Sequence, residues 1–272
     1  MKNHYKLLVL DVDGTLVDGD GIISPEDEEA IVQVHRLGIP VALSTGRAVQ
    51  ACQRFLDRLA LDGHHIFFDG ALVSNPGLGE EVYAKEIKKD LARQAVGFAH
   101  EKEMNLELFS STHYFVERET WASDIRRNFF RIEPTVVDFD RLWQSERIIK
   151  GTLVVASAEE KAKANSFRRH FARNFYFSLT KTPAYPEVDF INIVTNGVSK
   201  GNALEALAAH LGIPLAEVIA IGDGLNDVSL LDTAGLGIAM AGAPDALKAV
   251  ADSVTLDVKH SGVALAVKQF LL

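Results

Sequence analysis

Near its start the sequence runs KLLVLDVDGTL, from Lys6 to Leu16. The apolar run that ends at Leu10 shows no alternation of polar and apolar side chains, and it stops abruptly at Asp11 and Asp13. An unbroken apolar run bounded by a turn is typical of a strand buried on both faces, as in a parallel sheet covered by helices. This stretch therefore predicts the first strand of an α/β domain, with two carboxylates at its carboxyl end.

The chain on either side of a central block alternates between apolar runs and helical patterns. Ser24 and Pro25 are suited to begin a helix that reaches about Leu37. The other expected core elements include strands at Ile39–Leu43, Val188–Val194, Val218–Ile221 and Leu236–Met240 and helices at about Arg47–Leu59, Lys200–Leu211 and Leu225–Leu231. Strands that alternate with helices indicate a doubly wound α/β fold with a mostly parallel sheet.

The central block, residues 81–185, differs in texture, because it holds most of the aromatic residues and almost no glycine. Its helical and strand patterns predict an α+β module inserted into the α/β core. We therefore expect a core formed by residues 1–80 and 186–272, with residues 81–185 as an inserted domain. Arginines such as Arg126 and Arg168 are expected to lie on helix faces above packed aromatic side chains rather than to bind nucleic acid.

Composition excludes several classes of function. The chain has 272 residues, a formal net charge of −9 and 47% hydrophobic residues, which argues for a folded protein and against broad binding to nucleic acid or anionic membranes. Its one cysteine, Cys52, excludes an internal disulfide and fits the reducing cytoplasm. No signal peptide is recognised and no apolar stretch approaches about 18 residues, so we expect a cytoplasmic protein without a membrane span.

Asp11 and Asp13 are the first candidate site residues. Side chains two positions apart on an extended strand point the same way, so both carboxylates face one site at the edge where open α/β sheets bind ligands. Two such neighbours repel each other unless a cation neutralises them or one takes a proton, and hard oxygen ligands favour Mg²⁺. An isolated Asp-x-Asp-Gly is more often a solvated turn, so further segments are needed to support the interpretation.

Two helix starts supply candidate anion-binding groups. Thr45 and Gly46 follow the second core strand and open a helix, where a hydroxyl and a backbone amide can bind an anion. Lys200 lies in the first turn of another helix, where a cation is unfavourable unless an anion also contacts it. Plain capping by Thr45 and a solvent-directed lysine are the alternative interpretations.

A third segment, Gly222–Asp227, follows the strand expected at Val218–Ile221. Asp223 and Asp227 return carboxylates to the same sheet edge, and Asn226 adds a neutral polar group. The segment lacks the G-x-G-x-x-G spacing of a dinucleotide-binding turn. Carboxylates, a hydroxyl, a lysine and helix-end amides together suit a phosphoryl group bound with Mg²⁺.

These segments carry a resemblance that covers essentially the whole chain. The sequence resembles haloacid dehalogenase (HAD) superfamily phosphatases of the Cof type, whose inserted α+β cap belongs to class IIB. The matching motifs, in family order, are DVDGTL at Asp11–Leu16, STGR at Ser44–Arg47, VSKGNAL at Val198–Leu204 and GDGLND at Gly222–Asp227. The resemblance implies a HAD-like core, a cap that selects substrates, and hydrolysis of phosphomonoesters through an aspartyl-phosphate.

The resemblance also implies a role for each candidate residue. Asp11 is the implied nucleophile, and Asp13 the general acid that later serves as the base. The implied phosphate-binding residues are Thr45, Gly46, Lys200 and Asn226. The implied Mg²⁺ site comprises Asp11, Asp13 through its main-chain carbonyl, Asp223 and, in support, Asp227.

Substrate and assembly stay open at this level. Sugar phosphates are the favoured class, with pyridoxal phosphate (PLP) or FMN as further candidates, and either a monomer or a homodimer is expected. A phosphomannomutase-like phosphomutase and a non-enzymatic, receiver-like phospho-acceptor are the alternatives. The sequence departs from the usual family residues at Asp69, Asn192, Gly242 and Ser261, which leaves the substrate contacts open.

Overall fold

The computed structural model describes residues 4–182 and 184–272. The chain divides into two compact units, the first formed by residues up to Arg47, Arg54–Tyr83 and Ser199–Leu272, the second by Ala48–Gln53 and Ala84–Val198. None of the helices in the described part of the chain is both long and apolar enough to cross a membrane.

The first unit is built on an eight-stranded sheet with the order β14-β13-β12-β1-β2-β3-β4-β5. Its strands are β1 (Leu7–Asp11), β2 (Val41–Ser44), β3 (His65–Phe67), β4 (Leu72–Asn75), β5 (Glu80–Ala84), β12 (Val218–Gly222), β13 (Leu236–Ala239) and β14 (Ser253–Val254). The pairs from β14 to β3 are parallel, whereas β3 and β4 are antiparallel. The mostly parallel sheet expected from the sequence is confirmed.

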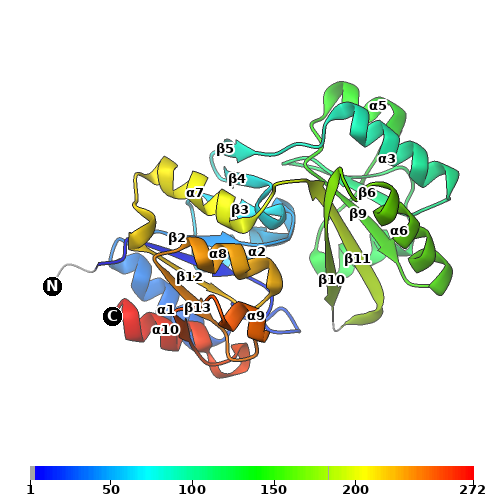
Figure 1. Cartoon of the computed structure of the whole chain (residues 1–272). Helices are drawn as coiled ribbons and strands as arrows, with labels where there is room; N and C mark the ends of the chain where they lie inside the picture. Colours follow the sequence, from blue (N-terminus) through cyan, green and yellow to red (C-terminus); the bar gives the residue numbers. More distant parts are fainter. Residues whose placement is uncertain (1–3, 183) are drawn as a thin grey trace. The chain divides into compact units, whose positions relative to one another are not determined.

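Helices lie on both faces of this sheet, as Figure 1 shows. They are α1 (Pro25–Arg36), α7 (Lys200–Leu211), α8 (Val228–Thr233), α9 (Asp245–Lys248) and α10 (Gly262–Phe270), while α2 (Val49–Leu59) spans the division between the units. Helices α7 and α8 share a buried apolar cluster with Leu7 and Val9 of β1. Helices α1 and α10 pack together on the opposite face, where the amide of Ala264 donates to Asp27.

Helix α1 illustrates how local sequence sets an element. Ser24 caps it by accepting a hydrogen bond from the Asp27 amide, and Pro25 occupies the first turn, where no amide hydrogen is required. Ile31 and Val34 on the inner face are fully buried. The expected helix start is confirmed.

The second unit has a six-stranded sheet with the order β10-β11-β9-β6-β7-β8. Its strands are β6 (Leu106–Phe109), β7 (Tyr114–Val116), β8 (Thr135–Val136), β9 (Lys150–Val155), β10 (Phe175–Thr182) and β11 (Tyr185–Thr195). One face packs against α3 (Lys89–Glu101), α5 (Phe139–Ser145) and α6 (Ala158–His170), and α4 (Trp121–Ile125) follows β7. The unit is therefore an α+β module.

Strand β11 differs from expectation. The sequence predicts Val188–Val194 as a core strand and a core that resumes at residue 186, but β11 pairs antiparallel with β9 and β10 in the second sheet. The first unit resumes only at Ser199. An apolar run predicts a buried strand but does not identify its partners, which is why this assignment was wrong.

The arginines of the second unit also differ in part from expectation. Arg126 is buried, donates to Glu107 at 2.6 and 2.9 Å, and lies 4.6 Å from the ring centroid of Phe190. Glu107 also accepts a hydrogen bond from the hydroxyl of Tyr114 at 2.7 Å. Arg126 is thus part of a buried, charged network rather than a helix surface.

Candidate active site

The site forms where three parallel strands end. In β1, Asp11 lies opposite Ser44, the last residue of β2, and Leu10 lies opposite Ile221, next to the end of β12. The segments that follow these strands therefore leave the sheet at the same edge. Asp11 is buried, whereas the side chain of Asp13, two residues beyond, is half-exposed.

Lys200 connects two carboxylates at this edge. It is the first residue of α7, which Ser199 caps by accepting from the Asn202 amide. Its ammonium lies 2.5 Å from Asp11 Oδ1 and 2.6 Å from Asp227 Oδ1, and its side chain has no exposed surface. A lysine without access to water is retained by the charges around it, so the solvent-directed alternative is excluded.

Burial and the neighbouring charges together shift the pKa of Lys200, Asp11 and Asp223. Burial alone would lower the pKa of Lys200, but the charges of Asp11 and Asp227 raise it above its usual value. For Asp11, burial and the charge of Asp227 raise the pKa well above its usual range, while Lys200 acts in the opposite direction. Burial, followed by the charge of Asp227, raises the pKa of Asp223 to about 6.

Asp227 organises the turn after β12. Its Oδ2 accepts hydrogen bonds from the amides of Asp223 and Gly224 at 3.1 and 2.9 Å, while its Oδ1 faces Lys200. Asp223 accepts a hydrogen bond from the Thr15 hydroxyl at 3.1 Å. These bonds connect the turn after β12 to the turn after β1, where Gly14 adopts a φ of +90° and a Cβ would collide with Asp223.

A divalent cation fits the acidic part of the site. One carboxylate oxygen from each of Asp11, Asp223 and Asp227 lies within 4.8 Å of the others. Oxygen donors of this kind are those that Mg²⁺ prefers. A cation would offset both the repulsion between the carboxylates and the cost of burying their charges, which raise the pKa of Asp11 and Asp223. Both oxygens of Asp227 also accept hydrogen bonds, so this residue positions Lys200 and the turn in addition to lying in the acidic cluster.

The carboxylate of Asp13 lies outside this cluster. Arg47 holds it with two donors, Nε at 2.8 Å from Oδ2 and the terminal nitrogen at 2.5 Å from Oδ1. Arg47 is itself buried, and its guanidinium lies 5.3 Å from the ring centroid of Phe55. The sequence alone assigns no role to Arg47. The one feature that could have indicated a role is its position as the last residue of the STGR motif.

Thr45 and Gly46 follow β2 and face the turn that holds Asp69. The Thr45 hydroxyl accepts from the Arg47 amide at 3.1 Å, and the Thr45 carbonyl accepts from the Asp69 amide at 3.0 Å. A Cβ at Gly46 would lie 2.8 Å from Asp69 Oδ1. A side chain at Gly46 would force the Asp69 carboxylate to shift. The helix expected from about Arg47 begins at Val49, so the Thr45 hydroxyl stabilises the turn before α2 and is not its cap.

Asp69 is a second site residue that sequence reasoning did not assign. It is buried in the short turn Phe68–Gly70, has a φ of +57°, and accepts a hydrogen bond from Asn226 at 3.0 Å. Asp69 therefore joins Asn226 to the Thr45–Gly46 turn. The sequence noted it only as a departure from the family residue.

Every residue assigned from the sequence thus lies at or beside this sheet edge: Asp11, Asp13, Thr45, Gly46, Lys200, Asp223, Asn226 and Asp227.

The other three positions that depart from the usual family residues lie elsewhere. Asn192 is in the second unit, hydrogen bonded to Thr180 at 2.9 Å. The Ser261 hydroxyl donates to Ser24 at 2.9 Å, and a Cβ at Gly242 would meet no atom within 4 Å.

Comparisons with known proteins agree with one another. A family model described as haloacid dehalogenase-like hydrolase matches residues 8–267. Phosphatase YwpJ of Bacillus subtilis (strain 168) is 31% identical over 291 residues, covering 98% of this chain and 100% of that protein. From the same organism, the 5-amino-6-(5-phospho-D-ribitylamino)uracil phosphatase YcsE is 27% identical, covering 98% of this chain and 96% of that protein.

A solved structure gives the same picture in three dimensions. The HAD subclass IIB sugar phosphatase BT4131 matches with a TM-score of 0.76 and 26% sequence identity, covering 97% of this chain and 98% of that one. Each of these matches spans both units of the chain.

Proposed function

This chain belongs to the haloacid dehalogenase-like hydrolase family and is a phosphatase, and from that premise we propose that it hydrolyses small phosphorylated metabolites in a Mg²⁺-dependent reaction. The observation that carries the proposal is the buried Lys200 between Asp11 and Asp227, at the sheet edge where Asp223 also lies. Sugar phosphates are the favoured substrates, supported by the named function of the similar structure. PLP and FMN are the next candidates.

Asp11, Asp223 and the main-chain carbonyl of Asp13 are the groups that would hold Mg²⁺, with Asp227 in support. When bound, Mg²⁺ neutralises negative charge on the phosphoryl oxygens. Lys200 adds a fixed positive charge on the same side, and its burial makes that charge more effective than it would be in water. Together these charges allow an anionic nucleophile to approach an anionic phosphoryl group.

Asp11 is the proposed nucleophile. Its carboxylate attacks phosphorus, the bond to the leaving oxygen breaks, and an aspartyl-phosphate forms on Asp11. Thr45, Gly46 and Asn226 would bind the phosphoryl oxygens through the hydroxyl, the backbone amide and the side-chain amide. Asp69 serves as a positioning residue, because it fixes Asn226 relative to the Thr45–Gly46 turn.

Asp13 is the proposed acid and base. In the first step it gives a proton to the leaving oxygen, and in the second it takes one from the water that attacks the aspartyl-phosphate. Its carboxylate is paired with Arg47 in this structure. For proton transfer, an Asp13 oxygen would have to exchange its bond to Arg47 for one to the leaving oxygen.

The second unit is proposed to be the cap that selects substrates, a role supported by its α+β composition and by the subclass of the similar structure. We also propose a cytoplasmic enzyme, in keeping with the lone buried Cys52. A monomer or a homodimer fits this function equally well.

A phosphate-release screen tests the proposal. Purified protein would be incubated with a panel of sugar phosphates, PLP and FMN, with Mg²⁺ or with a chelator, and with Asp11→Asn as the inactive control. We expect multiple turnovers on at least one sugar phosphate, lost with chelator and in the control. Activity that persists in Asp11→Asn or with chelator contradicts the mechanism.

The two alternatives left open by the sequence are not favoured, because the similar proteins are named phosphatases. The same screen separates them. A phosphomutase converts mannose-1-phosphate to the 6-phosphate without releasing phosphate, and a phospho-acceptor does not turn over repeatedly.

A further inference from the structure

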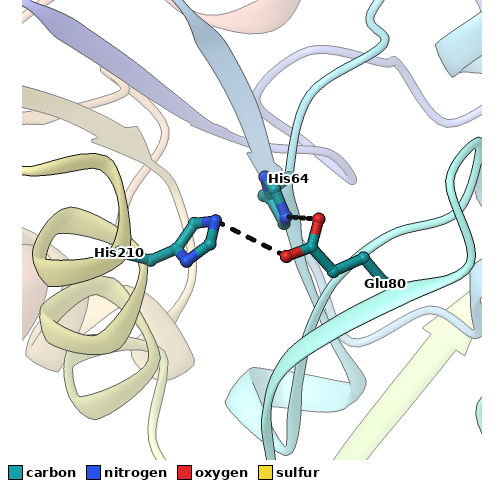
Figure 2. A group of neighbouring side chains, drawn as sticks. All are labelled: His64, Glu80 and His210. Carbon is teal, nitrogen blue, oxygen red and sulfur yellow. Dashed lines mark ion pairs between the residues drawn. The ribbon is translucent and has the colours of Figure 1, made fainter.

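Two histidines and a glutamate meet in the first unit, away from the acidic residues described above. His64 immediately precedes β3, Glu80 is the first residue of β5, and His210 lies in the last turn of α7. Figure 2 shows the two imidazole rings on the same side of the Glu80 carboxylate, with an ion pair from one ring to each oxygen. Because the three are 16 and 130 residues apart along the chain, no local motif announces them.

The distances are those of a nearly assembled ligand set. His64 Nε2 lies 3.4 Å from Glu80 Oε2, and His210 Nε2 lies 4.0 Å from Glu80 Oε1. The two ring centroids are 4.5 Å apart. One donor atom from each residue lies within 4.8 Å of the other two.

His64 Nε2 faces the Glu80 carboxylate as an ion pair but has no hydrogen bond among the residues that the structure describes. The atom is buried and makes no hydrogen bond to any residue that the structure describes, and only 11% of the side chain is exposed. Buried polar nitrogens are rarely left in this state, because they lose their water without compensation. The unfilled position faces Glu80 and His210.

An ion pair alone does not account for the arrangement. One carboxylate can neutralise one imidazolium, but here two rings share it, and two charged rings with centroids 4.5 Å apart would repel each other. Two neutral imidazole nitrogens and one carboxylate oxygen instead form the donor set that Zn²⁺ takes in His₂Glu sites. Imidazole favours such transition metals over Mg²⁺, which suits the all-oxygen acidic site.

The geometry needs little adjustment to accept the ion. With metal–ligand bonds of about 2.0–2.2 Å, neighbouring donors of a tetrahedral site lie roughly 3.4 Å apart. The distance from His64 Nε2 to Glu80 Oε2 already has this value, whereas His210 Nε2 lies 4.0 Å from the other oxygen, Oε1, so Glu80 and His210 must move for one oxygen to serve both rings. Both moving side chains are free to do so, since those of Glu80 and His210 are 46% and 33% exposed.

The backbone around the cluster is fixed by Asn75. Its buried side chain donates to the carbonyl of Asp62 at 2.8 Å and accepts from the amide of Leu78 at 3.1 Å. The loop before His64 and the turn before Glu80 are thus held to the same residue. His210 adds a ligand near the negative end of a helix dipole, which favours a cation.

We propose that His64, Glu80 and His210 bind one Zn²⁺ or a similar divalent transition-metal ion, with a fourth position open to water. The ion would tie β5, the last strand at that edge of the sheet, to the end of α7. This site is independent of the Mg²⁺ site and of the phosphatase reaction.

Metal binding measured in excess Mg²⁺ tests the proposal, because Mg²⁺ occupies the acidic site and competes poorly for imidazole. Equilibrium dialysis with Zn²⁺ gives stoichiometry and affinity, Co²⁺ absorption reports tetrahedral coordination, and thermal unfolding reports stabilisation. The variants are His210→Ala and Glu80→Gln. His260→Ala is the matched control, because His260 lies 2.8 Å from Asp257 as another histidine–carboxylate pair outside the cluster.

We expect the wild type and His260→Ala to bind one Zn²⁺, to give a tetrahedral Co²⁺ spectrum and to melt at higher temperature with Zn²⁺. His210→Ala and Glu80→Gln should lose at least about tenfold in affinity, together with the spectrum and the stabilisation. Phosphate release in Mg²⁺ should be unchanged in both. The proposal is overturned if the wild type binds no Zn²⁺ in excess Mg²⁺, if the two variants bind as well as the wild type, or if His260→Ala weakens binding equally.

Discussion

Lys200 is the residue on which the catalytic site depends most, because it neutralises two carboxylates that are themselves buried. Burial raises the pKa of Asp11 even with this lysine present, so the arrangement is held together by opposing charges rather than by solvation. A single substitution at any member of this group should therefore change both stability and activity.

Replacing Lys200 by methionine should lower the free energy of unfolding by about 3–5 kcal/mol, because Asp11 and Asp227 remain buried without the positive charge that neutralises them. Phosphate release should fall by about 10²–10³-fold, since the phosphoryl oxygens lose a fixed positive charge. Thermal unfolding and initial rates measure the two effects. The matched control, Lys6→Met, removes an exposed lysine paired with Glu217 and should change neither noticeably. Equal effects at both positions would contradict the role of burial.

Asp223 predicts how stability depends on pH. Its pKa in the folded protein, about 6, is above its ordinary value, so the folded state binds this proton more tightly than the unfolded chain. The resulting stabilisation is complete below about pH 4 and is lost as the pH rises through about 6. With a chelator present, the free energy of unfolding should therefore fall by up to roughly 3 kcal/mol as the pH rises through this range and Asp223 loses its proton.

Denaturant titrations at several pH values measure this effect. Asp223→Asn should flatten the pH dependence, and Asp245→Asn, at an exposed carboxylate, should leave it unchanged. Mg²⁺ should restore stability above about pH 6, because it favours the ionised carboxylate. A wild-type profile that matches Asp223→Asn would show that Asp223 titrates normally.

Asp13→Asn should separate substrates by their leaving groups. An alkyl phosphate needs a proton on its leaving oxygen, so its turnover should fall by about 10²–10⁴-fold. The phenolate of p-nitrophenyl phosphate leaves without help, so its turnover should fall far less. Steady-state kinetics on both substrates measures the ratio, and full turnover of the alkyl phosphate would exclude Asp13 as the acid.

At the scale of elements, the site depends on how closely three turns approach one another. Gly46→Ala would place a Cβ 2.8 Å from Asp69 Oδ1 and force the Asp69 carboxylate, which holds Asn226, to shift. We expect at least about a tenfold loss of kcat/KM, as displacements of this size cost in other sites. Gly242→Ala is the control, because its Cβ would meet no atom within 4 Å and should leave the rate unchanged.

The sequence predicted the elements that depend on local signals. The apolar run before Asp11 and the cap at Ser24 each predict a structure that is present. The pairing of distant segments could not be predicted in this way. The run at Val188–Val194 predicts a strand, which is present, but its antiparallel partners β9 and β10 depend on the turns and packing of the second unit. Local periodicity carries no information on that choice.

The candidate site shows the same division. The carboxylates and Lys200 were predicted, because they follow strands or open helices whose ends must meet at one edge. Arg47 and Asp69 were missed as site residues, because their roles depend on side-chain contacts with Asp13 and Asn226, which lie 34 and 157 positions away in the chain. Only the folded geometry reveals such pairs.

At the scale of the whole molecule, two units with separate sheets and separate buried clusters share one chain. The second unit contains its own buried charge pair, Glu107 with Arg126. Arg126→Ala should destabilise that unit by about 3–5 kcal/mol, because Glu107 would remain buried without its partner.

Calorimetry with and without Mg²⁺ separates the contributions of the two units. The Arg126→Ala variant should unfold at lower temperature while the stabilisation by Mg²⁺ persists, since the acidic cluster lies in the first unit. Arg127→Ala, at a partly exposed arginine next to Arg126, should have little effect. Loss of Mg²⁺ stabilisation in Arg126→Ala would mean that the units do not act separately.

The central claim is that Asp11 forms a bond to phosphorus, and mass spectrometry of the enzyme quenched in acid during turnover tests it most directly. We predict a mass increase of one phosphoryl group on the peptide that contains Asp11, removed by hydroxylamine and absent from Asp11→Asn. Steady phosphate release with no phosphoryl group on that peptide, or with the group on another residue, would contradict the account.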